Sequence, residues 1–71
     1  MNRYLAVVFN NNCEQMYERA VNGIDICTVR EVCEGAEIYN AEIERDRGAS
    51  NEIVYNVYAG GESYFVEFKA I

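Results

Sequence analysis

Apolar residues occupy every position from 4 to 9, and this run contains β-branched and aromatic side chains but no glycine or proline. Such a run is typical of a β-strand, and the three asparagines at 10–12 bound it. Because both faces of a strand over 3–9 would be apolar, we expect it to lie inside a sheet and not at its edge.

The next segment has the period of a helix. Asn12 can cap its first turn, Gln15 has the capping-box spacing, and Gly23 can end it. One apolar stripe recurs at i, i+3, i+4, i+7 and i+8, formed by Cys13, Met16, Tyr17, Ala20 and Val21. The sequence therefore predicts the main helix over 12–23, covering one face of the sheet.

Residues 24–35 leave two alternatives open. Thr28 and Glu31 have capping-box spacing, and Gly35 could close a helix of two turns. Its core-facing side chains would be Val29, Val32 and Cys33. The β-branched content suits a short strand equally well. We favour the short helix.

Residues 37–44 alternate between two faces, which predicts a half-buried strand. The core face would carry Tyr39, Ala41 and Ile43, and the other face Ile38, Asn40, Glu42 and Glu44. The polar stretch that follows, 45–51, is expected to be a flexible connector.

The last twenty residues predict a β-hairpin around Gly60 and Gly61. A two-residue turn would place Val57 opposite Tyr64, Tyr55 opposite Val66 and Ile53 opposite Phe68, with all six on one face. The other face would pair Glu52 with Lys69 and carry Val54, Asn56, Tyr58, Phe65 and Glu67. A slip by one residue would destroy this agreement, so the register is well specified.

These elements predict one α+β domain over 1–71, since 71 residues leave no room for a second core. We expect a four-stranded, mostly antiparallel sheet with the main helix and the short second helix on one face. The chain order would be strand, helix, short helix, strand, strand, strand. The main helix and the short helix together can cover only one side of this sheet. The other side must therefore meet water, a second copy or a partner.

Twelve acidic and six basic residues give a net charge of −6. This charge opposes direct nucleic-acid binding, which depends on lysine and arginine, but favours association with a basic protein surface. Three cysteines at irregular spacing and no secretory pattern indicate a reducing compartment. Because no apolar run approaches the roughly 20 residues of a membrane span, we expect a cytoplasmic protein that does not bind membranes.

Residues suited to catalysis or metal binding are scarce. The chain has no histidine, and Cys13, Cys27 and Cys33 lack the spacing of a redox pair or a zinc site. We expect the three cysteines to be buried apolar residues. Glu42, Glu44 and Asp46 could share a strand face, but no calcium-loop motif is present. The sequence thus predicts no catalytic residue, no metal and no cofactor.

The sheet face away from the helices is expected to mix aromatic and acidic side chains. We place on it the candidate partner-binding residues Tyr4, Tyr58, Phe65, Glu42, Glu44, Glu52 and Glu67, together with Val8, Ile38 and Val54. A solvated sheet face is normally polar, whereas apolar area mixed with charge marks interaction sites, where tyrosine is enriched.

The chain is therefore predicted to be a non-enzymatic protein-binding module, an inhibitor or nucleic-acid mimic that occupies a basic surface of a partner protein. In size and charge it resembles small phage-encoded inhibitors of host defence, including anti-CRISPR proteins, which implies the host cytoplasm as its location. No motif carries this resemblance, and it transfers no functional residue. The alternative is a small structural or assembly subunit, a homodimer that buries the same face against a second copy.

Overall fold

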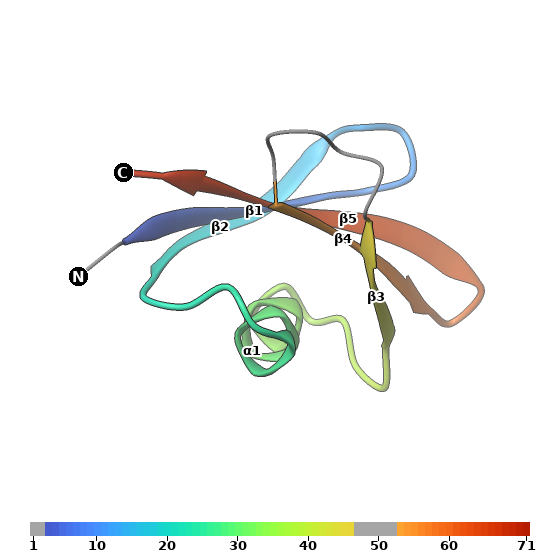
Figure 1. Cartoon of the computed structure of the whole chain (residues 1–71). Coiled ribbons are helices and arrows are strands. Elements are labelled where there is room, and N and C mark those ends of the chain that lie inside the picture. The colour runs from blue at the N-terminus through green and yellow to red at the C-terminus, as the bar shows by residue number, and fades with distance from the viewer. Residues whose placement is uncertain (1–2, 47–52) are drawn as a thin grey trace.

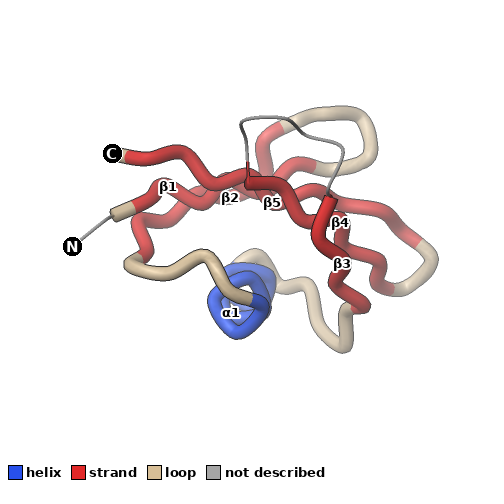
Figure 2. Tube along the Cα trace, in the orientation of Figure 1, coloured by secondary structure: helices blue, strands red, loops and turns tan. Residues whose placement is uncertain are grey.

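The computed structural model describes residues 3–46 and 53–71. These residues form a five-stranded antiparallel sheet of order β2-β1-β5-β4-β3 with one helix, α1, on one face (Figure 1; Figure 2). The elements are β1 (Tyr4–Phe9), β2 (Gln15–Val21), α1 (Ile26–Gly35), β3 (Glu42–Asp46), β4 (Ile53–Ala59) and β5 (Glu62–Ala70). The chain is an α+β protein, but the prediction of four strands and two helices is wrong.

The helix predicted over 12–23 is wrong because β2 occupies most of that segment. Asn10 organises a turn there, with its side-chain Oδ1 accepting hydrogen bonds of 2.9 Å from the N–H groups of Asn12 and Glu14. β2 then pairs antiparallel with β1. An isolated helix of this length is marginal in water, whereas the pairing satisfies the backbone of β1 on a second side. The expectation that β1 is an interior strand is confirmed, since it lies between β2 and β5.

Of the two alternatives for 24–35, the helix is confirmed. Its cap is Asp25 and not Thr28: Asp25 Oδ1 accepts from the Thr28 N–H at 2.9 Å and from the Thr28 hydroxyl at 2.8 Å. Val29, Val32 and Cys33 are buried, as predicted. α1 is too short and too polar to cross a membrane, and the described residues form no other helix.

The strand predicted over 37–44 begins later, because β3 starts at Glu42. Glu37 and Asn40 adopt left-handed φ values of 63° and 56°, which interrupt an extended strand. The connection from α1 therefore turns twice before β3. Tyr39, predicted in the core, is consequently 61% exposed, whereas Ile38 is buried in the core.

The polar connector predicted over 45–51 is shorter than expected at its start. Arg45 and Asp46 belong to β3, where they pair with Tyr55 and Val54 of β4. The rest of that prediction, 47–51, lies outside the described residues.

The hairpin of β4 and β5 is confirmed in the predicted register. Gly60 and Gly61 have φ values of 58° and 79°, and a two-residue type I′ turn requires this left-handed backbone at both positions. The pairs are Ile53 with Phe68, Tyr55 with Val66 and Val57 with Tyr64. The predicted pair of Glu52 with Lys69 cannot be placed, because Glu52 lies outside the described residues.

The core lies between α1 and the sheet. Tyr55 crosses it: its ring meets the Phe68 ring edge to face at 6.0 Å, and its hydroxyl donates to the Ile24 carbonyl at 2.7 Å. The buried cluster comprises Ala6, Val8, Val29, Val32, Cys33, Ile38, Tyr55, Val57, Val66 and Phe68. Because α1 covers this face alone, the opposite face of the sheet is the candidate for function (Figure 1).

Candidate functional site

The sheet face opposite α1 is called the open face here. Successive side chains of a strand point to opposite faces, so each strand gives the open face the residues that alternate with its core residues. Reading across the strand pairs, its members include Val7, Phe9, Glu18, Glu42, Glu44, Asp46, Val54, Asn56, Tyr58, Phe65, Glu67 and Lys69.

Apolar and aromatic side chains form the middle of the open face. Phe9 of β1 and Phe65 of β5 are directly paired and half-buried. Val7 beside them is only 3% exposed, although it points away from α1. Tyr58 of β4 is 44% exposed and pairs with Glu42 of β3. The open face therefore carries more apolar area than a sheet surface made for water alone.

Carboxylates lie on three strands of the open face, β2, β3 and β5. One row crosses the whole sheet in the order Glu18, Val7, Glu67, Val54 and Asp46. Glu42 and Glu44 add two exposed carboxylates on β3.

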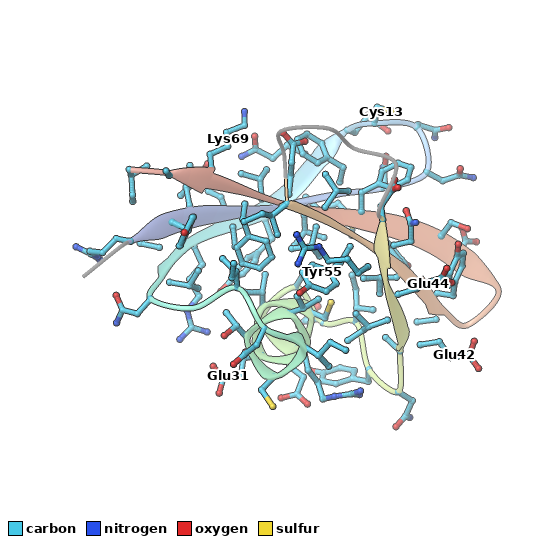
Figure 3. The ribbon with its side chains drawn as sticks, in the orientation of Figure 1. Cys13, Glu31, Glu42, Glu44, Tyr55 and Lys69 are labelled. Carbon is cyan, nitrogen blue, oxygen red and sulfur yellow. The ribbon has the colours of Figure 1, made fainter. Side chains whose placement is uncertain are left out.

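Positive charge is sparse on this side of the described strands. Lys69 lies at the far end of the sheet from Glu42 and Glu44 (Figure 3). Arg19 and Arg45, which pair with Ala6 and Tyr55, belong to the helix side. The alternation of the strands thus leaves the open face predominantly negative.

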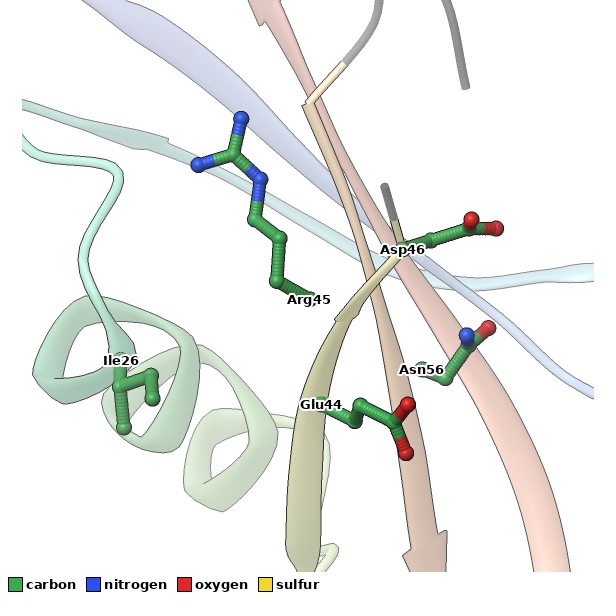
Figure 4. A pocket seen from close by; sticks show the side chains of 5 residues that line it. All are labelled: Ile26, Glu44, Arg45, Asp46 and Asn56. Atoms are coloured by element: carbon green, nitrogen blue, oxygen red, sulfur yellow. The ribbon is translucent and has the colours of Figure 1, made fainter. Parts of the chain in front are cut away.

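The edge strand β3 shows this division of charge most clearly. Arg45 extends to the opposite side of β3 from Glu44 and Asp46 (Figure 4). Its guanidinium carbon lies 5.7 Å from the centroid of the Tyr55 ring, on the α1 side. Glu44 and Asp46 point to the other side (Figure 4). Shallow hollows border the strand, one lined by Ile26, Glu44, Arg45, Asp46 and Asn56, the other by Arg30, Ala41, Glu42, Ile43, Glu44 and Tyr58.

Most of the candidate residues predicted from the sequence lie together. The residues on the open face are Glu42, Glu44, Tyr58, Phe65 and Glu67, with Val54. The prediction that Tyr4 lies on the open face is wrong. Tyr4 packs against the core on the α1 side, because it alternates in step with Ala6 and Val8 along β1. Val8 and Ile38, also expected on the open face, are buried in the core. Glu52 lies outside the described residues.

Sequence reasoning missed Glu18 and Phe9 as members of this face. Glu18 was assigned to a helix, so its alternation with Tyr17 and Arg19 was not used. The period-two signal is present, since Tyr17 and Val21 pack toward the core while Glu18 is exposed. Arg19 pairs with Ala6 and so lies on the core side of β2, where a strand pattern would lead one to expect an apolar residue.

The cysteines are only partly as expected. Cys33 is buried, and this burial raises the pKa of its thiol to about 11, so the thiol stays protonated near neutral pH. Cys13 and Cys27 are exposed, which corrects the prediction that all three are buried. Cys13 lies in the turn before β2, with a left-handed φ of 62°, and not on a helix stripe.

Within residues 3–46 and 53–71, no three cysteine, aspartate or glutamate side chains are grouped so that they could hold a metal ion. Comparison of this chain with protein-family models, with curated proteins and with solved structures yields no match.

Proposed function

We propose that this chain is a non-enzymatic binding module whose open face engages a basic surface of another protein. The observation that carries the proposal is the combination of four glutamates with half-buried aromatic rings on one face. Charge of one sign steers an oppositely charged partner toward the face, and the rings supply apolar area for a lasting contact. The glutamates are Glu18, Glu42, Glu44 and Glu67.

We infer further that the partner surface is a groove that binds nucleic acid. Such grooves combine lysine and arginine, which track the backbone, with aromatic side chains on which bases stack. Glutamates beside Phe65 and Tyr58 offer the same two features, negative charge and aromatic faces, to that groove. A chain that occupies the groove excludes nucleic acid from it, so the proposed role is that of a small inhibitor acting as a nucleic-acid mimic.

The test compares two charge reversals of equal size. Glu42→Lys with Glu44→Lys alters the open face, whereas Glu31→Lys with Glu34→Lys alters exposed positions of α1 on the other side of the sheet. Each tagged protein is used to capture proteins from a bacterial lysate at low and high salt, and mass spectrometry identifies them. Circular dichroism confirms that every variant is folded.

We expect the wild type and the α1 variant to capture nucleic-acid-binding proteins that single-stranded DNA then displaces. The open-face variant should lose them. High salt should weaken the capture, because the screening length falls from about 8 Å at physiological salt to about 3 Å at 1 M. Equal, salt-independent capture by the folded Glu42→Lys, Glu44→Lys variant would refute the acidic mimic.

Self-assembly is the second candidate function, and the half-buried pair Phe9 and Phe65 favours it. In that case the open face would be covered by a second copy. The mass of the protein in solution separates the two candidates, as developed below.

A further inference from the structure

β3 is the last strand of the described sheet, so one of its backbone edges faces away from β4. An edge of this kind presents N–H and C=O groups with which another extended chain can pair. Which residues present them follows from the alternation of hydrogen-bonded and non-hydrogen-bonded pairs in antiparallel strands.

The phase of that alternation is fixed at the other side of the sheet. The Ile71 N–H donates to the Arg3 carbonyl at 3.0 Å, which makes these two residues a hydrogen-bonded pair in line with the β1–β5 register. Residues of β5 whose backbone groups do not face β1 face β4, and the same alternation applies in turn to β4 and to β3. Followed across these pairs, it places the backbone groups of Glu42 and Glu44 toward β4. The backbone groups of Ile43 and Arg45 then face the outer edge.

The turn of the β4–β5 hairpin gives the same phase independently. In a two-residue hairpin the residues that flank the turn, here Ala59 and Glu62, form a hydrogen-bonded pair. This again directs the backbone groups of Asn56 and Tyr58 toward β3, and those of Ile43 and Arg45 away from β4.

The two sides of this edge differ in chemistry. Toward the open face, a chain laid along β3 would meet the exposed carboxylates of Glu42 and Glu44. Toward α1 it would meet the side chain of Ile26, which is 48% exposed and lines one of the hollows that border β3 (Figure 4). Opposite charges on directly facing positions of neighbouring strands stabilise their pairing.

We propose that β3 accepts an added strand from the partner, an extended segment with lysine or arginine at alternate positions and apolar residues between them. The basic side chains face Glu42 and Glu44, and the apolar ones face the α1 side. This inference rests on the proposed function and specifies it, because it states which kind of partner segment is recognised. Backbone pairing provides affinity in such contacts, and alternate side chains provide specificity.

A second copy of this chain is a poor occupant of the same edge. Antiparallel pairing of two β3 strands about Ile43 would set Glu42 of each copy against Glu44 of the other. Like charges on facing positions destabilise a strand pair. The charges that favour a basic segment therefore disfavour self-pairing.

The test uses two synthetic peptides of identical composition. One alternates lysine and valine over nine residues, and the other carries all its lysines in one block. A contact that depends on charge alone binds them equally, whereas strand addition requires the alternation. We expect the alternating peptide to bind the wild-type protein about tenfold or more tightly in fluorescence anisotropy, a difference of about 1.4 kcal/mol.

The matched variants remove one outward N–H at either edge of the sheet. Arg45→Pro removes it from β3, and Arg45→Thr loses the same side chain but keeps the N–H. Ala20→Pro removes the outward N–H of β2, at the opposite edge. Proline is tolerated at such edge positions, and circular dichroism verifies the fold.

We expect the alternating peptide to bind Arg45→Pro about tenfold more weakly than Arg45→Thr, and Ala20→Pro to bind like the wild type. Equal binding of both peptides, unaffected by Arg45→Pro, would overturn strand addition but leave the charge-based function standing. Failure of both peptides to bind a wild type that captures basic proteins would also overturn it. If the wild type captures no nucleic-acid-binding protein but binds the alternating peptide in a way that Arg45→Pro weakens, strand addition at β3 is supported and the nucleic-acid mimic is refuted.

Discussion

The phenol of Tyr17 on β2 lies directly against Gly35 in the last turn of α1. A β-carbon added to Gly35 would come within 2.5 Å of the Tyr17 hydroxyl oxygen and 2.8 Å of Cζ. The contact joins the helix to an edge strand, and a β-carbon at position 35 would force the Tyr17 ring to move. The sequence suggested glycine here for another reason, as a helix terminator.

Gly35→Ala should therefore destabilise the protein. Helix propensity alone would favour alanine by up to about 1 kcal/mol, so a net loss shows that the clash with Tyr17 outweighs propensity. In a Tyr17→Val background the ring is gone, and the same substitution should become neutral or stabilising. Urea denaturation of the four proteins measures this change of sign. A stabilising Gly35→Ala in the wild-type background would contradict the contact.

Tyr55→Phe should lower the free energy of unfolding by about 1 kcal/mol, because it removes the donor to the Ile24 carbonyl in a part-buried site. Tyr58→Phe is the control, since it deletes the same hydroxyl from an exposed ring of the open face. We expect the control to change urea stability by less than about 0.5 kcal/mol. Equal effects of the two substitutions would argue against the hydrogen bond that links the sheet to the entry of α1.

The helix cap should make stability depend on acid pH. Hydrogen bonds from the Thr28 N–H and hydroxyl lower the pKa of Asp25 below its ordinary value of 3.8. Because the folded pKa is lower than the unfolded one, the ionised cap contributes stability above about pH 4 that is lost as the pH falls through the folded pKa. Asp25→Asn keeps a capping side chain that does not titrate.

The melting temperatures of the wild type and Asp25→Asn, compared between about pH 5 and pH 2, measure this effect. The advantage of the wild type should shrink as the pH falls, while contributions of the other carboxylates cancel in the difference. A constant difference over this range would mean that the cap does not act through its charge.

Thiol labelling should divide the cysteines into two classes. Cys13 and Cys27 are exposed and should react with a thiol reagent in the native protein. Cys33 should react slowly until denaturant is added, because it is buried and its pKa is raised to about 11. Mass spectrometry counts two adducts in buffer and three in denaturant under this expectation. Three rapid adducts in buffer would show that α1 opens readily from the sheet.

Salt should separate partner binding from self-assembly. For the proposed binding module we expect the 8.1 kDa monomer at both low and high salt. An open face buried against itself would bring like charges together, so its dimer should instead strengthen as salt rises. Sedimentation velocity at micromolar concentration distinguishes these outcomes. A dimer that Tyr58→Ser with Phe65→Ser dissociates without unfolding would favour the assembly subunit.

The parts of the fold that the sequence predicted are those with local causes. The β4–β5 hairpin follows from Gly60 and Gly61 together with alternation on both sides, and β1 from a run apolar on both faces. For the helix at 26–35 the sequence left a strand open and favoured a helix from its spacing and Gly35, but it missed the cap at Asp25. Each of these patterns is complete within one segment or one turn.

The errors concern segments whose structure depends on distant neighbours. The stretch 15–21 has acceptable spacing for either a helix or a strand, and its pairing with β1 decides between them. Part of the candidate site was lost with that strand, because Glu18 joins the open face only through the pairing. Tyr4 was assigned to the wrong face for a similar reason: a strand apolar on both sides does not reveal which side meets the helix.

The antiparallel pairing of β1 with β5 at the centre of the sheet has a consequence for how the chain folds during synthesis. The termini lie near each other at one end of the sheet (Figure 1). The pairing of β1 with β5 therefore joins the first and the last strand of the chain. β1 and β2 can pair early, but a lone hairpin is marginally stable in water. At about 5–20 residues per second, β5 follows about 2 to 10 s after β2. Until β5 is synthesised, β1 has a paired strand on one side only, and the sheet face that α1 covers is incomplete.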